Sequence, residues 1–145
     1  MVAPRDEHTA VLDEPNGTMV VFGGFQDGER NNSVAIYQLK TNIWQKVKHP
    51  ENAKLPCPRS GHTAVVHDGS MYVFGGKADK GIKLNDLWAF NLLSHAWKKI
   101  NPVDEVIPEI RSGHSSCIYE DLILVFGGIF EITRELNDVY GFSIS

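Results

Sequence analysis

The chain has 145 residues, 42% of them hydrophobic and 22% charged, and it carries a formal net charge of −4. This is the composition of one ordinary globular domain, and the acidic balance argues against sequence-independent binding of nucleic acid, which needs a basic surface. No apolar run approaches the roughly 18 residues of a membrane span, and the first residues lack the basic-then-apolar pattern of a secretory signal. We therefore expect a cytoplasmic protein that binds neither nucleic acid nor a membrane.

Strand and turn signals begin near the N-terminus and end near the C-terminus. The first unit has an Asn16-Gly17 turn, after which the apolar stretch Met19–Phe22 runs into Gly23-Gly24. The last unit has Leu124–Phe126 running into Gly127-Gly128. In that unit Glu120-Asp121 takes the turn position without a glycine, so we expect a longer or different turn there.

The middle unit shows all the local signals most clearly. We expect four strands in it, at residues 62–66, 71–74, 87–90 and 96–100. Asp68-Gly69 between the first two is a strong hairpin signal. Gly75 and Gly76 should end the second strand, and residues 77–85 should form a polar loop.

The landmarks of these units recur with a nearly constant period. The glycine pairs begin at positions 23, 75 and 127, a constant step of 52 residues. Histidines recur at 8, 62 and 114, asparagines at 32, 85 and 137, aromatic residues at 37, 90 and 142, and tryptophans at 44 and 97. Sheets of this kind are apolar on both faces and must be sandwiched between copies of themselves, which radial stacking of four-stranded sheets achieves.

Several motifs recur from one unit to the next. In the second unit they are Arg59-Ser-Gly-His62, Gly75-Gly76, Asn85-Asp86-Leu87-Trp88-Ala89-Phe90 and Trp97. The third unit repeats them as Arg111-Ser-Gly-His114, Gly127-Gly128 and Asn137-Asp138-Val139-Tyr140-Gly141-Phe142. The first unit departs from the pattern with Glu7 before His8 and with Ser33-Val34 after Asn32.

Together these motifs resemble those of the kelch-repeat β-propeller family. The resemblance covers essentially the whole chain and implies an all-β fold. We expect a partial kelch-type β-propeller of about three four-stranded antiparallel blades, at about residues 5–48, 59–100 and 111–145, with the last strand of the third blade missing. A closed propeller has typically 4–8 blades. The chain is therefore a fragment of a longer propeller, one half of a homodimer that closes a six-bladed ring, or part of a larger assembly.

Most of the repeated residues are expected to be structural. Glycine pairs suit backbone with positive φ or a close approach, and Gly76–Gly81 lacks the Lys-Ser/Thr of a phosphate loop. Aromatic residues should fill the space between sheets, and each histidine should hydrogen-bond a backbone group rather than bind metal. The structural set is Gly23, Gly24, Trp44, His62, Gly75, Gly76, Trp97, His114, Gly127 and Gly128, joined by the aromatics Tyr37, Phe90 and Phe142.

No motif for catalysis is present. The sequence lacks a nucleophile elbow, a metalloprotease helix and paired-cysteine metal sites, and we interpret Cys57 and Cys117 as free thiols. It does not match the copper site of galactose oxidase or the ligand pattern of the iron-dependent specifier proteins, which are propellers of this broad kind. We expect no enzyme activity, no metal and no cofactor.

The chain is expected to be a protein–protein interaction scaffold. In an up-and-down sheet the loops between second and third strands, residues 25–31, 77–83 and 129–135, emerge at the same end as the connections 48–59 and 101–111. The predicted partner-binding residues are Asp27, Arg30, Arg59, Lys77, Lys80, Lys83, Arg111, Glu131 and Arg134. The alternative is a regulatory propeller of a larger enzyme or ligase adaptor, and a propeller oxidase or lyase is the weakest candidate.

Overall fold

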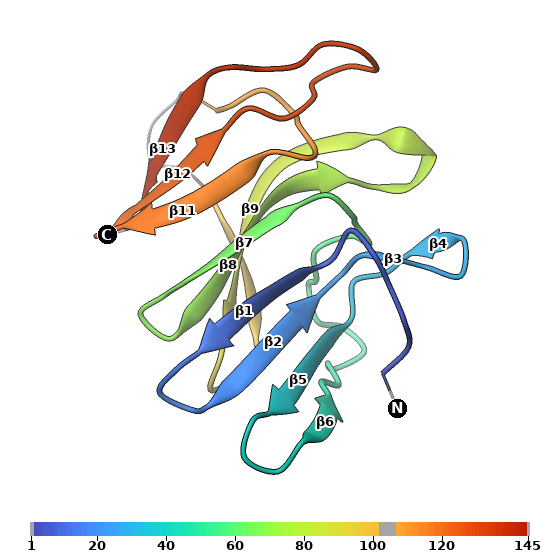
Figure 1. Ribbon diagram of the computed structural model, residues 1–145, viewed down its shortest axis with the longest axis vertical. Helices are drawn as coiled ribbons and strands as arrows, with labels where there is room; N and C mark the ends of the chain where they lie inside the picture. Colours follow the sequence, from blue (N-terminus) through green and yellow to red (C-terminus); the bar gives the residue numbers. More distant parts are fainter. Residues whose placement is uncertain (1, 102–106, 145) are drawn as a thin grey trace.

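Three antiparallel sheets follow one another along the chain in the computed structural model, which describes residues 2–101 and 107–144 (Figure 1). We call them blades 1, 2 and 3. Blade 1 contains β1 (Thr9–Asp13), β2 (Thr18–Phe22), β5 (Val34–Gln38) and β6 (Ile43–Lys46); blade 2 contains β7 (Thr63–His67), β8 (Ser70–Lys77), β9 (Lys83–Asn91) and β10 (Trp97–Ile100); blade 3 contains β11 (Ser115–Tyr119), β12 (Leu122–Phe126) and β13 (Val139–Ser143). A small hairpin of β3 (Phe25–Gln26) and β4 (Glu29–Arg30) follows β2, and a 3₁₀ turn spans Asp79–Gly81. The predicted all-β stack of antiparallel blades is confirmed.

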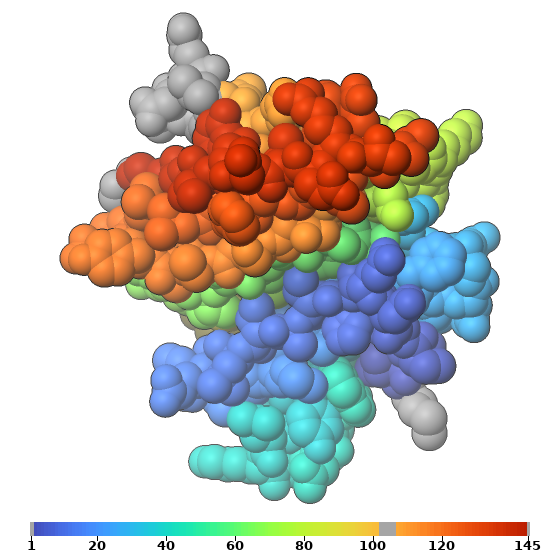
Figure 2. Space-filling view, turned by 45° about the horizontal axis from the view of Figure 1, so that its top comes forward, coloured from blue at the N-terminus to red at the C-terminus, as the bar shows by residue number. Residues whose placement is uncertain are grey.

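The blades stack with their first strands side by side. β1 contacts β7, and β7 contacts β11, while β6 and β10 form the far edges of their sheets. The space-filling view shows the three blades as successive layers, from blue through green to orange (Figure 2). Among the described residues, no helix has the length and apolar character needed to cross a membrane.

Both faces of a blade carry apolar side chains because successive residues of a strand point to opposite faces. The core between blades 1 and 2 consists of Val20, Phe22, Val34, Ile36, Met71, Val73, Phe90 and Leu92. The core between blades 2 and 3 consists of Val65, Phe74, Leu87, Ile123, Val125 and Phe142. Burial of these β-branched and aromatic side chains on the neighbouring blade is the main force that holds the stack together.

The two repeated tryptophans have different environments. Trp97 packs on Phe22 of blade 1 and on Phe90 of its own blade, with ring centroids 4.8 and 5.0 Å apart. Trp44 is 37% exposed and packs on Tyr37 of its own sheet at 4.9 Å. Within the described residues no sheet lies on that face of blade 1, so a role of Trp44 and Tyr37 as filling between sheets stays a prediction.

The hairpin turns show how the chain replaces a glycine. Asp68 and Gly69 have φ of 41° and 68°, the positive values that a two-residue type I′ turn requires. The turn at Glu120-Asp121 is not longer, since Tyr119 pairs directly with Leu122, but it is different, since only the first of its two residues has a positive φ. Glu120 itself adopts a φ of 51°, so the turn stays short without a glycine.

The central hairpin of blade 2 is longer than predicted. β8 continues through the glycine pair to Lys77, and β9 begins at Lys83 instead of residue 87. A register shift between Phe74 and Gly76 marks a β-bulge, after which Lys77 pairs with Lys83. The stretch expected to be a loop is therefore a projecting hairpin, which places its lysines beside each other.

Candidate functional site

The connections between second and third strands lie together at one end of the molecule (Figure 1). We call this surface the loop end and define it by residues 25–31, 77–83 and 129–135. Arg30 Nη1 of the first connection lies 4.0 Å from Asp79 Oδ1 of the second. Lys83 Nζ of the second donates a hydrogen bond of 2.8 Å to the backbone carbonyl of Glu131 in the third. Three segments about 52 residues apart in sequence thus form one continuous surface.

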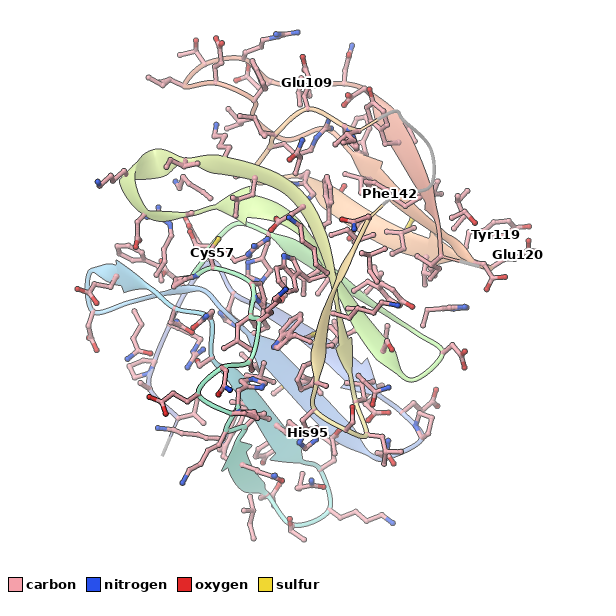
Figure 3. All side chains as sticks on the ribbon, turned by 180° about the vertical axis from the view of Figure 1, so that it is seen from behind. Cys57, His95, Glu109, Tyr119, Glu120 and Phe142 are labelled. Carbon is pink, nitrogen blue, oxygen red and sulfur yellow. The ribbon has the colours of Figure 1, made fainter. Side chains whose placement is uncertain are left out.

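Repeated asparagines fasten the connections between blades to this end. Asn32 Nδ2 donates to the Pro56 carbonyl at 2.9 Å, and Asn85 Nδ2 donates to the Pro108 carbonyl at 3.0 Å. Figure 3 shows Cys57 and Glu109 at this end of the molecule, far from the turn at Glu120. Residues 102–106 of the second connection lie outside the described residues.

A hollow of about 600 Å³ opens between the second and third connections. Its lining is Gly81, Ile82, Lys83, Ile110, Phe130, Glu131, Ile132 and Thr133. Ile82 is 59% exposed and Ile132 is 96% exposed, so large aliphatic groups face solvent beside a lysine. The charge pattern of the loops does not indicate these apolar residues; the stretch Ile129-Phe130-Glu131-Ile132 is the sequence signal for them.

The lysines of blade 2 form a basic edge beside this hollow. Lys77 and Lys83 are cross-strand partners. Burial, and then the charge of Lys77, lower the pKa of Lys83. Neither lysine forms an ion pair with any residue that the structure describes. Lys80 sits between them at the tip of the hairpin, exposed and with a φ of 57°. An anion placed at this edge would relieve the repulsion between like charges.

The other predicted charges have mixed surroundings. Asp27 is exposed at the β3–β4 turn with a φ of 52°. Arg30 lies over the ring of Phe25, 5.4 Å from its centroid, and donates to the Ser60 hydroxyl. Arg134 lies 5.1 Å from the ring centroid of Phe130, next to the hollow, and 3.8 Å from Glu109. Arg134 therefore adds a second positive group at the rim.

Arg59 and Arg111 do not belong to this surface. Both are fully buried, and each guanidinium donates two hydrogen bonds, of 2.7 and 2.9 Å, to a carboxylate of its own blade, Asp86 or Asp138. Each also donates to the carbonyl of the first glycine of its pair. Their prediction as partner contacts is corrected, because a side chain enclosed in this way cannot reach a partner.

These arginines lower the pKa values of their carboxylate partners, Asp86 and Asp138. Burial alone would raise the pKa of Asp86, but the hydrogen bonds and charge of Arg59 outweigh it and hold that pKa below its usual value. Hydrogen bonds from Arg111 likewise lower the pKa of Asp138. In blade 1 the equivalent of Asp86 is Ser33, whose hydroxyl lies 3.0 Å from Arg5 Nη1. Arg5 therefore has no carboxylate partner at that position, and burial lowers its pKa.

The glycine pairs and histidines form the joints between blades. A Cβ at Gly23 would lie 2.8 Å from His62 Cε1, and a Cβ at Gly75 would lie 2.9 Å from His114 Cε1. The His62 ring packs on Phe22 at 5.1 Å, and its Nε2 lies 2.9 Å from the Thr9 hydroxyl. His114 Nε2 lies 3.2 Å from the backbone carbonyl of Phe74. Each histidine thus fits into the preceding blade, in space that only glycine leaves open.

Acidification is expected to weaken these joints. Burial, and then the charge of Arg59, lower the pKa of His62 to about 3, and burial lowers that of His114 to about 4. Because the unfolded value is near 6.5, their stabilising contribution is complete above that pH and is lost as the pH falls towards the folded values. The loss should be about 2 kcal/mol for each imidazole between pH 6.5 and 5.

Urea unfolding at pH 7 and pH 5 measures this effect. The double variant His62→Asn/His114→Asn will be less stable at both pH values, but its stability should change much less between them. Asp86 and Asp138 should not contribute to the change between pH 7 and pH 5, because their pKa values are lowered below those of ordinary carboxyls. A variant that keeps the full pH dependence would show that other groups cause it.

Metal ligands are not gathered anywhere in the described parts of the chain. Within residues 2–101 and 107–144, no group of three His, Cys, Asp or Glu side chains lies close enough to hold an ion. Cys57 and Cys117 are both free and exposed. The groups that the loop end does present are exposed aliphatic side chains, hydrogen-bonding groups and lysines.

Comparisons with known proteins agree with the repeated geometry. The Rho GTPase-activating protein gacHH of Dictyostelium discoideum is 34% identical over 139 residues, 94% of this chain but only 9% of that protein. Kelch domain-containing protein 3 of Homo sapiens is 34% identical over 134 residues, 86% of this chain and 34% of that protein. The chain thus spans about a third or less of the length of these relatives.

Fold and family models complete the comparison. The solved structure of YjhT matches 97% of this chain with a TM-score of 0.79, at 21% identity, while the match covers 49% of the YjhT chain. The family model described as the KLHDC2/KLHL20/DRC7 Kelch-repeats domain matches residues 1–145. Kelch repeats generally form protein-interaction domains. The fold is a partial kelch-type propeller, and the chain belongs to the Kelch-repeat family.

Proposed function

We propose that this chain is a protein-interaction scaffold that binds a protein or peptide segment at its loop end. The observation that carries the proposal is the hollow of about 600 Å³ between two neighbouring blades, with exposed aliphatic residues inside it and lysines beside it. Aliphatic surface provides affinity through burial, and charges at the rim provide specificity and faster association.

The proposed partner segment has two chemical features. An aliphatic or aromatic side chain enters between Ile82 and Ile132, where it would remove exposed apolar surface from water. Acidic groups next to it face Lys77 and Lys83, which form no ion pair with the described residues. Arg134, which lies over the ring of Phe130 beside the hollow, gives a second contact for a carboxylate.

Reversing the basic edge is the test of this proposal. The triple variant Lys77→Glu/Lys80→Glu/Lys83→Glu should bind a captured partner about tenfold more weakly or worse, since each surface ion pair contributes up to about 1 kcal/mol. The partner is first identified by affinity capture with the wild-type chain and mass spectrometry, and its binding is then measured by calorimetry.

A matched control separates this site from a general change in charge. Lys40, Lys98 and Lys99 are exposed on the β5–β6 turn and on β10, away from the loop end. Their triple replacement by Glu changes the net charge equally and should leave binding intact. Equal binding by both triple variants would contradict the proposal. The proposal also assigns no catalytic step, so copper or iron bound at near one equivalent would contradict it as well.

The second candidate function is that of a regulatory propeller domain within a larger protein. The match to gacHH, a Rho GTPase-activating protein of which this chain covers 9%, favours it. An antibody against the loop end should then detect, in cells, a protein much larger than the 16.2 kDa of this chain. A single band at 16.2 kDa would count against this candidate without affecting the loop-end site.

A further inference from the structure

A second hollow, of about 340 Å³, lies between blades 1 and 2 at the end of the molecule opposite the loop end. We call it the turn-end hollow, because it lies beside the short turns of these two blades. Both blades have all four strands, so both walls of the hollow are present in the chain. His95 marks its position in Figure 3, far from Glu109 at the loop end. The lining residues are Asp13, Asn16, Thr18, Ile36, Gln38, Gln45, Leu92, Leu93 and His95.

Asp13 brings a negative charge to this hollow without a positive partner. The residue ends β1 and is only 5% exposed. Asn16 Nδ2 donates to its Oδ2 at 2.8 Å, and the Thr18 hydroxyl donates to the same oxygen at 3.5 Å. Among the described residues no donor reaches Oδ1, and no cation forms an ion pair with this carboxylate. Burial of a carboxylate without a compensating cation is unfavourable, so Oδ1 is available to a positive group from outside.

The local turn needs an acceptor at position 13 but not a charge. Gly17 N closes the β1–β2 turn by donating to the Glu14 carbonyl at 3.1 Å. An amide oxygen can accept from two donors just as a carboxylate oxygen does. The residue that ends the first strand is His67 in blade 2 and Tyr119 in blade 3. The repeated fold therefore does not require the carboxylate of Asp13.

The rest of the lining suits a primary ammonium group on an aliphatic chain. Gln38 pairs with Thr18, which pairs with Asp13, so the three lie in one row across the sheet. The side-chain amides of Gln38 and Gln45 supply further acceptors, and Leu92 gives an apolar wall for methylene groups. A guanidinium prefers to engage both carboxylate oxygens, whereas an ammonium acts as a point charge with three donors. Because only Oδ1 is free, the geometry favours the ammonium.

We propose that the turn-end hollow receives a lysine side chain of a protein partner, with its ammonium group on Asp13 Oδ1 and its methylene groups against Leu92. Leu93 stands at the rim and is 90% exposed. It extends the apolar surface beyond the reach of a single amine, so the occupant is a lysine that has an apolar neighbour in a protein chain. This surface is separate from the loop end, and the two can be occupied at the same time.

Titration with a capped tripeptide tests the proposal. Acetyl-leucyl-lysyl-leucinamide is added to the isotope-labelled chain, and NMR follows the side-chain amide signals of Asn16, Gln38 and Gln45. These signals should shift until the site is saturated. A peptide with norleucine in place of the lysine should bind about tenfold more weakly or worse, because it loses a charged hydrogen bond. The peptide with arginine should bind more weakly than the lysine peptide, since one carboxylate oxygen is already occupied.

Asp13→Asn is the main variant. It keeps an acceptor for Asn16 and Thr18 but removes the charge, so the chain should stay folded and bind the lysine peptide about tenfold more weakly or worse. Asp68→Asn is the matched control, because it removes the same charge from an exposed turn at this end, outside the hollow. Gln38→Lys places an ammonium of the chain itself in the hollow and should also exclude the peptide. It tests the site even if Asp13→Asn does not fold, and circular dichroism reports on folding.

Three results would overturn the proposal. The first is the absence of saturable shifts with the lysine peptide, and the second is unchanged binding in the folded Asp13→Asn variant. The third is binding of butylammonium as tight as that of the peptide, which would assign the hollow to a free amine. The triple lysine variant of the loop end should bind this peptide normally, so the two proposals fail independently.

Discussion

Replacing Gly76 by alanine is expected to destabilise the chain by about 2–5 kcal/mol. Gly76 has a φ of 98°, which side chains rarely adopt. A Cβ there would lie 2.8 Å from both His62 Cβ and the Ser60 carbonyl oxygen, and 3.0 Å from the His62 amide nitrogen. Two of these atoms belong to the backbone and cannot rotate away. Urea unfolding followed by tryptophan fluorescence measures the change in the free energy of unfolding.

Gly69→Ala is the matched control for that experiment. Gly69 also has a positive φ, 68°, but a Cβ there would meet nothing within 4 Å. This variant should therefore lose only the conformational term of about 1–2 kcal/mol. If both variants lost the same stability, close packing at the glycine pair would not explain why that residue is needed.

Removing the carboxylate of Asp86 should destabilise the chain by about 3 kcal/mol or more. Asp86→Ala leaves the guanidinium of Arg59, which is fully buried, without its charge partner. The Trp88 indole, which donates to Asp86 at 2.7 Å, also loses its acceptor. Breaking a buried ion pair from one side is costly because the remaining charge stays desolvated. Thermal and urea unfolding measure the loss.

Asp79→Ala provides the comparison at an exposed pair. The side chain of Asp79 is 72% exposed and lies 4.0 Å from Arg30, so its removal should cost less than about 1 kcal/mol. The double variant Arg59→Met/Asp86→Ala should recover part of the loss, since it leaves no unpaired charge. A double variant less stable than Asp86→Ala alone would mean that Arg59 contributes through contacts other than this pair.

The candidate site was only partly accessible from the sequence. The three connections at the loop end, and the lysines of the second, followed from the order of strands within each unit. The hollow did not, because Ile82 and Ile132 come from different repeats and their separation depends on how the blades pack. The burial of Arg59 could not be predicted from the sequence either, since its partner Asp86 lies 27 residues away across the sheet.

The sequence by itself determined the repeated architecture of this protein. Each repeat has strands with two apolar faces and a glycine pair at a fixed position, and the glycine pairs recur every 52 residues. These features depend on residues within one repeat, so they can be recognised in the sequence. The tertiary structure alone decided which residues are buried at the joints and which remain exposed. Phe22, Phe74 and Phe126 are the same residue type at the same place in the repeat, yet their exposed fractions are 0%, 1% and 53%. That difference depends on what stands on the next face, because burial is a property of neighbouring blades and not of the residue.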